Sequence, residues 1–134
     1  MITCYFEKKK KKVFLRHVVV DILVVKNKRI LLVKRAGPKW YLETGKWAMP
    51  GGFVEMGETF IKLFQVNDNP HRPHELQRQN VSLIYLIKPV KKVSQHDHET
   101  SEIKWFDLDQ LPSVKNFAFD HLETTQQLIT SLDK

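Results

Sequence analysis

The alternation of apolar and polar positions predicts a strand-rich domain that ends in a helix. A run rich in β-branched residues, Val13–Val25, predicts a strand. A second strand is predicted over Arg29–Arg35, and the short polar break between the two indicates a hairpin. Apolar side chains at helical spacing predict a helix over Phe119–Leu132. Further strands are predicted over Phe60–Val66, Asn80–Ile87 and Glu102–Phe106, with one helical turn over Asp107–Leu111.

Two of these strands are apolar on both faces, VVVDILVV and SLIYLI. A sheet buries each hydrophobic face against another layer. The pattern contains a single long helix, which can cover only one face. We therefore expect that a helix is missing from the given sequence.

Length and composition indicate one ordinary globular domain. The chain has 134 residues, of which 42% are hydrophobic and 28% charged. No apolar run has the length of a membrane span. The N-terminal segment, MITCYFEKKKKK, does not have the pattern of a signal peptide. The single cysteine, Cys4, excludes an internal disulfide framework, so we expect a cytoplasmic protein.

The formal net charge is +7, and much of it comes from Lys8–Lys12. A basic balance is compatible with nucleic acid or with a polyphosphate ligand. A lysine run is more often a solvated tail than a nucleic-acid arm, and we prefer that interpretation. The excess of basic residues also fits the loss of an acidic segment.

The most informative segment is WAMPGGFVEMGET, residues Trp47–Thr59. Gly51 and Gly52 allow the backbone to turn tightly and to approach a ligand closely. Glu55 and Glu58 follow them and add hard oxygen ligands, which suit a divalent cation beside a phosphate. The simpler interpretation is a plain turn between two short strands, Trp47–Met49 and Phe53–Val54.

This segment resembles the opening of the Nudix box, the signature of the Nudix hydrolases. The family pattern is Gly, five residues, Glu, seven residues, then Arg-Glu-U-x-Glu-Glu-x-Gly-U, where U is a bulky aliphatic residue. Gly52 and Glu58 fill the first half at the correct spacing. After Thr59 the chain runs FIKLFQVNDNPHRP, without an Arg-Glu or a Glu-Glu pair. In the family, the absent half is a helix whose carboxylates hold most of the catalytic metal.

The resemblance extends over most of the chain. RILLVKR and GKWAMPGG are similar to the second strand of these proteins and to the approach to the box. NPHRPHELQRQNVSLIYL, HETSEIKWFDLDQLP and AFDHLETTQQLI resemble the strands, the late acidic loop and the closing helix that follow it. The resemblance implies an α/β fold, a Nudix-like α-β-α sandwich with a mixed β-sheet, in a single domain over residues 1–134. It also implies that a helical segment is missing near residues 59–61.

The function implied by this resemblance is Mg²⁺-dependent hydrolysis of a nucleoside diphosphate linked to another group, with Mn²⁺ as a possible substitute. ADP-ribose is the leading substrate, and the products would be a nucleoside monophosphate and a phosphorylated product. In the family's arrangement the Gly51 carbonyl would help to bind the metal. Glu58 would contact the metal or one of its ligands, whereas Glu55 would brace the loop.

Other site residues are candidates from the late and middle loops. Glu99 is our first choice for a general base or an extra metal ligand and Glu102 the second, although most glutamates are simply exposed. Arg35 ends a strand beside the glycine loop, where a guanidinium could bind phosphate or form a strand-end salt bridge. Arg72 and Arg78 are expected to face phosphate or sugar. Histidine-containing clusters at 71–75 and 96–98 give only weak metal-site signals.

Two alternatives to an enzyme stay open. A Nudix-like module that has lost its metal helix would bind nucleotide or RNA without turnover. A basic RNA-binding protein would need aromatic side chains interleaved on a basic face, and the lysine run has few. We therefore do not favour nucleic acid or a membrane as partner. A homodimer is possible, although nothing in the sequence marks an interface.

Overall fold

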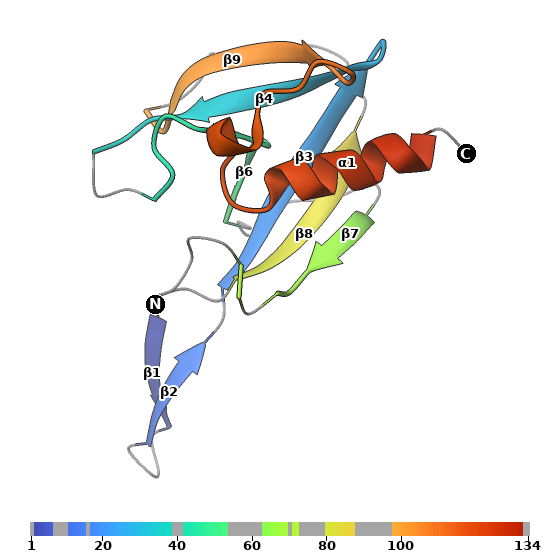
Figure 1. Ribbon diagram of the computed structural model, residues 1–134. Coiled ribbons are helices and arrows are strands. Elements are labelled where there is room, and N and C mark those ends of the chain that lie inside the picture. Colours follow the sequence, from blue (N-terminus) through green and yellow to red (C-terminus); the bar gives the residue numbers. More distant parts are fainter. Residues whose placement is uncertain are drawn as a thin grey trace.

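The computed structural model describes residues 2–6, 11–15, 17–38, 42–53, 63–69, 71–72, 80–87 and 98–132. These residues form two β-sheets, one α-helix and one short 3-10 helix (Figure 1). The elements are β1 (Ile2–Phe6), β2 (Lys11–Leu15), β3 (His17–Lys26), β4 (Arg29–Arg35), β5 (Trp47–Ala48), β6 (Gly51–Phe53), β7 (Leu63–Asn67), β8 (Asn80–Ile87), β9 (Thr100–Asp107), η1 (Val114–Asn116) and α1 (His121–Leu132).

The first two strands form a sheet of their own. β1 and β2 pair antiparallel, from Ile2 opposite Leu15 to Phe6 opposite Lys11. The single strand predicted over Val13–Val25 was therefore wrong. It is divided between β2 and β3, because β2 pairs with β1 in the small sheet whereas β3 lies in the large one.

The predicted hairpin is confirmed, and its two strands soon separate. Asn27 and Lys28 form the turn with φ angles of 51° and 56°, the left-handed conformation of a type I′ turn. β3 and β4 pair only next to this turn, at Val25–Ile30 and Lys26–Arg29. Beyond these pairs β3 continues along β8 and β6, whereas β4 continues along β9 and β5. The hairpin thus opens into two diverging halves of one sheet.

The large sheet has seven strands and is mixed. Its main path is β5-β4-β3-β8-β7, with β6 also paired to β3 and β9 to β4. β3 and β8 are parallel over eight residue pairs, and the other pairings are antiparallel. The expected α/β class with a mixed sheet is confirmed. Residues 54–62, near which the second helix of the sandwich was expected, lie outside the described residues.

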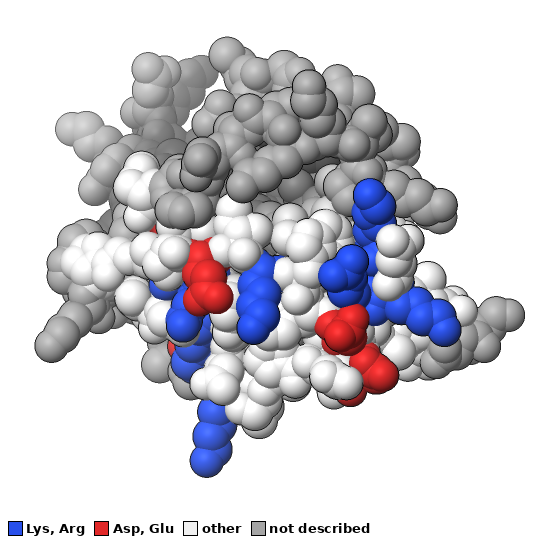
Figure 2. Space-filling model, turned by 90° about the horizontal axis from the view of Figure 1, so that it is seen from above, with Lys and Arg blue, Asp and Glu red and all other residues white. Residues whose placement is uncertain are grey.

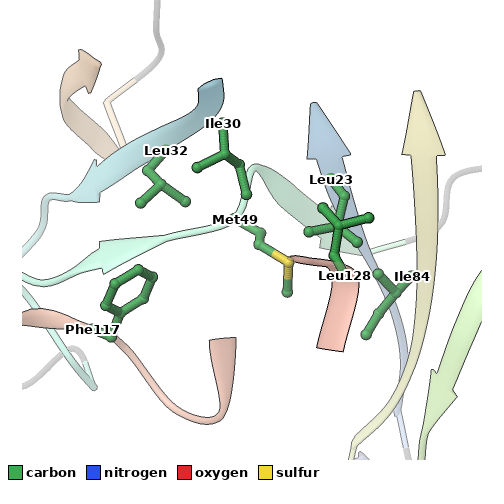
Figure 3. Close-up of a cluster of buried hydrophobic side chains, with 7 residues drawn as sticks. All are labelled: Leu23, Ile30, Leu32, Met49, Ile84, Phe117 and Leu128. Carbon is green, nitrogen blue, oxygen red and sulfur yellow. The ribbon is translucent and has the colours of Figure 1, made fainter. Parts of the chain in front are cut away.

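Helix α1 covers one face of this sheet and closes the core (Figure 1). Leu128 of α1 is fully buried against apolar side chains from both halves of the sheet. Figure 3 shows the cluster, with Met49 between the side chains of the two halves. The members are Leu23, Ile30, Leu32, Met49, Ile84, Phe117 and Leu128.

Some predicted element boundaries differ from those in the structure. The helix begins at His121 and not at Phe119, whose φ of 50° is left-handed and cannot belong to a right-handed helix. The helical turn predicted over Asp107–Leu111 was wrong. A hydrogen-bonded turn, Gln110 N to Asp107 O at 3.0 Å, takes its place, and the short 3-10 helix η1 follows it. The strand predicted over Phe60–Val66 is confirmed from Leu63 onward as β7, and residues 60–62 lie outside the described residues.

The sequence also predicts that Trp47, Trp105, Phe106 and Phe119 are core residues, but all four are only partly buried. Trp47 and Phe106 pack against the cluster and meet edge to face, with ring centroids 4.8 Å apart. Trp105 and Phe119 are half-buried. Among the described residues, no helix is both long and apolar enough to span a membrane.

Candidate functional site

The glycine-rich segment bridges the two halves of the sheet at the place where they diverge. β5 pairs with β4, at Val33–Ala48 and Lys34–Trp47. β6 pairs with β3, from Val19–Phe53 to Asp21–Gly51. Met49 and Pro50 therefore span the gap between the halves. We call the segment Met49–Gly52 the glycine crossing. The Pro50 carbonyl accepts a 2.7 Å hydrogen bond from the backbone N–H of Ile22, which fixes the far side of the crossing.

Gly51 is packed so closely against β3 that only glycine fits. A Cβ added at this position would lie 2.1 Å from the Val20 carbonyl oxygen and 2.8 Å from Oδ1 of Asp21. At Gly52 an added Cβ would meet no atom within 4 Å. The requirement for glycine in the packing is therefore specific to Gly51.

Behind Gly51 lies a buried polar network centred on Asp21. This aspartate is only 8% exposed although it stands in the middle of an apolar strand. Ser82 of β8 donates a hydrogen bond from its hydroxyl to Oδ2 of Asp21. Nη2 of Arg72 lies 3.7 Å from the same oxygen. Burying a carboxylate is costly unless it is paired and hydrogen-bonded, and both conditions hold here.

The network continues to the start of α1. Nε of Arg72 donates a 2.7 Å hydrogen bond to Oδ1 of Asp120, the residue that precedes the helix. Nε2 of His121 lies 3.7 Å from Oδ1 of Asp21. Burial lowers the pKa of His121, and the positive charges of Arg72 and Arg35 act in the same direction, against the opposing effects of Asp21 and Asp120. The neutral form of the His121 ring is therefore favoured.

Arg35 and Arg72 contact the same aromatic ring. The guanidinium carbon of Arg35 lies 5.3 Å from the ring centroid of Phe119, and that of Arg72 lies 4.9 Å from it. Arg35 is also fixed at the end of β4, where Nε donates a 3.3 Å hydrogen bond to the Leu42 carbonyl. Cation–π contacts of this kind hold a guanidinium in place while leaving its charge intact.

Phe119 is held in a strained backbone conformation by Glu43. The left-handed φ of Phe119 is unusual for a bulky residue, and such outliers concentrate at functional sites. Its N–H donates to Oε2 of Glu43 at 3.4 Å, and Lys46 Nζ lies 2.9 Å from the same oxygen. The segment before α1 is thus tied to the loop that follows β4.

The structure brings Glu99 to the same end of the sheet as Arg35. The Glu99 carbonyl accepts a 2.8 Å hydrogen bond from Ala36, and Arg35 pairs with Thr100. Glu102 lies farther along β9, with Oε2 3.7 Å from Nζ of Lys34 on β4. Both glutamates are exposed, and their catalytic roles stay predictions.

The side of the molecule formed by β4 and β9 carries both signs of charge. Figure 2 views the molecule from that side and shows basic side chains interspersed with acidic ones over its described surface. The expectation that nucleic acid is not the partner stays a prediction.

Of the expected site residues, Glu55, Glu58 and Arg78 lie outside the described residues, as do His74, Glu75, His96 and Asp97 of the two weak histidine-containing clusters. His71 and His98 are exposed. Among the described residues, no group of three or more His, Cys, Asp or Glu side chains could hold a metal ion. The predicted roles of Glu58 and Arg78 therefore stay predictions. Arg72 is buried among acidic partners, and its predicted contact with substrate also stays a prediction.

A polar groove of about 180 Å³ lies between β7 and α1. Its described lining includes three carboxylates, Asp68, Asp120 and Glu123, and no lysine or arginine. A diphosphate would be repelled from such a lining.

The sequence interpretation missed most of the buried network. Asp21, Ser82, Asp120 and His121 were not singled out as site residues. A signal existed for Asp21, because a carboxylate inside a run of β-branched residues is buried and needs partners. Ser82 is 61 positions from Asp21, and Asp120 is 48 positions from Arg72, so only the fold shows that these pairs meet.

Comparisons with known proteins agree with this geometry. The family model described as NUDIX domain matches residues 15–62. The matched segment thus contains the glycine crossing and Glu58. An ADP-ribose pyrophosphatase of Methanocaldococcus jannaschii is 30% identical over 122 residues, which cover 78% of this chain and 68% of that protein.

Solved structures share the fold. A MutT NUDIX hydrolase from Burkholderia pseudomallei has a TM-score of 0.67 at 23% identity, covering 85% of this chain and 98% of that one. The NUDIX domain of Shewanella oneidensis NrtR, solved with ADP ribose, has a TM-score of 0.63 at 20% identity, covering 96% and 94%. A bifunctional NMN adenylyltransferase/ADP ribose pyrophosphatase from Francisella tularensis, solved with AMP and a Mn ion, has a TM-score of 0.64 at 24% identity, covering 87% of this chain and 42% of that one. Together with the family model and the archaeal relative, this shared fold shows that the chain belongs to the Nudix family of pyrophosphohydrolases.

Proposed function

We propose that this protein hydrolyses the diphosphate of a nucleoside diphosphate derivative, with ADP-ribose as the leading substrate and Mg²⁺ or Mn²⁺ as the metal. The products are a nucleoside monophosphate and a phosphorylated product. The observation that carries the proposal is the glycine crossing from β5 to β6, with Gly51 against β3 and Glu58 six residues after Gly52. The lone cysteine supports a cytoplasmic setting.

The names of the similar proteins support this substrate class. The archaeal relative is an ADP-ribose pyrophosphatase, one structural neighbour was solved with ADP ribose, and another was solved with AMP and a Mn ion. The two adenosine compounds named are ADP-ribose, which is a nucleoside diphosphate derivative, and AMP, the nucleoside monophosphate that hydrolysis of its diphosphate would release. A nucleoside diphosphate derivative as substrate accounts for both.

The residues present fit a divalent metal only as a minimal site. Mg²⁺ commonly binds to one or two carboxylates and completes its coordination with water and substrate phosphates. The Gly51 carbonyl and the Glu58 carboxylate supply that minimum, and the tight packing of Gly51 on β3 holds the carbonyl-bearing backbone in place. A bound metal would neutralise charge on the diphosphate oxygens and activate water.

The chain's own side chains supply orientation and proton transfer in this proposal. Arg35 binds a phosphate group, since a guanidinium matches two phosphate oxygens at once. Its position at the end of β4 places it next to Glu99. The Glu99 carboxylate accepts the proton of the attacking water, and Glu102 is the second candidate for that role. Arg72 and Arg78 assist on the phosphate or sugar side.

The alternative is a binding module that holds the nucleotide without turnover. The absence of the Arg-Glu and Glu-Glu pairs after Thr59 is the specific observation that favours it. In this case ADP-ribose would bind with and without Mg²⁺ and would be recovered intact.

The intact mass of the purified protein is the first measurement. A mass clearly above 15.8 kDa would reveal residues beyond the printed sequence, which is the expectation near residues 59–61. Mg²⁺-dependent hydrolysis of ADP-ribose is then followed by chromatography, with EDTA as the control. Glu58→Gln should abolish most of the turnover and leave the melting temperature nearly unchanged.

Three results separate the two candidates. Hydrolysis that requires the metal and Glu58 supports the enzyme. Calorimetric binding of ADP-ribose without hydrolysis, in a protein of 15.8 kDa, supports the binding module. If the protein neither binds nor hydrolyses ADP-ribose, then ADP-ribose is rejected as the ligand. A homodimer stays a prediction, which sedimentation analysis tests.

A further inference from the structure

His121 of α1 accepts a hydrogen bond from the backbone of Met49, at the point where the strand pairing is interrupted. Met49 lies between two short strands that pair with different halves of the sheet, so the strand pairing is interrupted at this residue. Met49 is 3% exposed, and its N–H would be buried without an acceptor. Nδ1 of His121 accepts that N–H at 2.9 Å, from a position 72 residues later in the chain.

The hydrogen bond defines the state of the imidazole ring. Nδ1 can accept only if it carries no proton, so the neutral ring must carry its proton on Nε2. Nε2 faces Oδ1 of Asp21 at 3.7 Å. This carboxylate favours the tautomer in which Nε2 is protonated. Burial of the ring, which is 3% exposed, opposes the charged form.

Asp21 provides a second link between His121 and Gly51, besides the hydrogen bond from Met49. In the register of β3 and β6, Asp21 stands opposite Gly51. Its Oδ1, the atom that faces His121, is also the atom that an added Cβ at Gly51 would approach to 2.8 Å. The same carboxylate therefore lies between the imidazole ring and the glycine backbone.

The segment before α1 runs beside the crossing and holds His121 in place. Ala118 donates its N–H to the Trp47 carbonyl at 2.8 Å, and Phe117 bridges to Trp47 in a parallel arrangement. Thr125 Oγ1 donates to the His121 carbonyl at 2.8 Å. The imidazole ring therefore projects from a fixed helix start and not from a loose loop.

From these contacts we propose that His121 is a positioning residue, which fixes the Met49–Gly52 crossing through the hydrogen bond from Met49 to Nδ1. This inference rests on the proposed function for its consequence in catalysis. The metal and the diphosphate would both be placed by the backbone at Gly51. A small displacement of that backbone should therefore lower turnover strongly, while the fold is retained.

Two substitutions separate the hydrogen bond from the packing of the ring. In His121→Asn the side-chain oxygen is separated from Cβ by the same number of bonds as Nδ1 of the histidine. It can therefore accept the hydrogen bond from the Met49 N–H. In His121→Gln the amide group is at the distance of Nε2, where its NH2 faces Asp21 as a donor, and the acceptor for Met49 is lost. Both variants are uncharged, so they differ chiefly in where the acceptor stands.

Hydrogen exchange measures the crossing directly, without metal or substrate. In His121→Gln the amides of Met49 and of residues 51–53 should exchange roughly tenfold faster or more, because a buried donor has lost its partner. The amides of residues 126–132 should exchange as in the wild type. His121→Asn should stay within a few-fold of the wild type throughout. Equal behaviour of the two variants, or uniform acceleration along the chain, would overturn the proposal.

Activity is measured on the same proteins. His121→Gln should lower kcat for ADP-ribose about tenfold or more with a smaller change in KM, and His121→Asn should restore most of the loss. Local loosening in exchange with unchanged kcat would refute the catalytic consequence. A wild type that neither binds nor hydrolyses ADP-ribose would instead reject the proposed function, and the exchange pattern would still decide whether His121 holds the crossing.

A spectroscopic measurement covers the case in which His121→Gln does not fold. Nitrogen NMR of the wild-type imidazole reports which ring nitrogen carries the proton. The expected result is a neutral ring, protonated at Nε2, with Nδ1 coupled across the hydrogen bond to the Met49 amide. A ring protonated at Nδ1 would contradict the proposal, because that nitrogen could no longer accept.

Discussion

Arg72 donates a 2.7 Å hydrogen bond from Nε to Oδ1 of Asp120, and both side chains are at least nine-tenths buried. The same guanidinium faces Asp21, so one cation serves two buried carboxylates. The pair joins the loop after β7 to the start of α1 and to β3. Breaking a buried pair leaves an uncompensated charge inside the protein, which costs far more than losing a surface pair.

Arg72→Met should therefore destabilise the protein by about 3–5 kcal/mol. The substitution leaves Asp21 and Asp120 buried without their cation, while the apolar part of the side chain is largely retained. The free energy of unfolding is measured by urea denaturation at pH 7.

Lys34→Ala is the matched control for this experiment. Lys34 pairs with Glu102 at 3.7 Å, and the two side chains are 38% and 47% exposed. An exposed pair contributes only about 0–1 kcal/mol. Equal losses for the two variants would contradict the view that the network of Arg72 is a buried, structural one.

Gly51→Ala and Gly52→Ala should differ strongly although the two residues are neighbours. A Cβ at Gly51 would lie 2.1 Å from the Val20 carbonyl, which is backbone and cannot rotate away. Overpacking of this kind costs about 1–3 kcal/mol or more. A Cβ at Gly52 would lie in open space, so we expect a change within roughly 0.5 kcal/mol. Urea midpoints provide the comparison, and a well-tolerated Gly51→Ala would show that β6 is not packed on β3 as described.

Stability should fall on acidification because His121 is buried in the neutral form. Its pKa is lowered from the ordinary value of 6.5, chiefly by burial. Below about pH 6.5 the unfolded chain binds a proton at this histidine, whereas the folded chain takes it up only at lower pH. The unfolded state then binds more protons, so the free energy of unfolding decreases as the pH falls from 7.5 to 5.5.

His121→Asn tests this assignment, because asparagine does not titrate. The unfolding free energies of both proteins are compared across the same pH range. The wild type should lose more stability than the variant. Parallel curves would mean that other groups cause the acid sensitivity and that His121 does not contribute.

The sequence was sufficient for the features that depend on local pattern. The β3–β4 hairpin follows from β-branched runs around a two-residue turn, and the strand Asn80–Ile87 was predicted with the bounds of β8. The start of α1 was misplaced because Phe119 is held left-handed by a distant residue, Glu43. Local pattern does not contain that constraint.

The site was predictable in part for the same reason. The glycine segment is contiguous, so its spacing is legible in the sequence. The network that supports it joins Asp21, Arg72 and His121, which come from a strand, a loop and a helix start. Aspartate, arginine and histidine side chains are often found at protein surfaces, so the sequence does not mark these three residues as partners. Only the fold, with its diverging sheet halves, brings them together.

Leu128→Ala should cost about 2–5 kcal/mol because it removes a fully buried side chain from the core. Leu132→Ala, four residues later on α1, is the control, since Leu132 is 53% exposed. Thermal unfolding of the two variants should separate clearly. A small loss at Leu128 would mean that α1 does not close the core over Leu23 and Ile84.

Arg35→Ala tests the assignment of the anion-binding side. Arg35 is fixed by its contact with Phe119 and its hydrogen bond to Leu42, so its guanidinium is already positioned before a ligand arrives. Loss of a charge-assisted, two-pronged contact should raise KM for ADP-ribose about 10–100-fold, which corresponds to roughly 1.5–3 kcal/mol. Arg35→Lys should recover only part of this loss, because lysine retains the charge but not the planar fork. Lys104→Ala, on the exposed face of β9, is the control for general charge effects. An unchanged KM in Arg35→Ala would leave Arg35 with a structural role alone, as the cation that stacks on Phe119 at the end of β4.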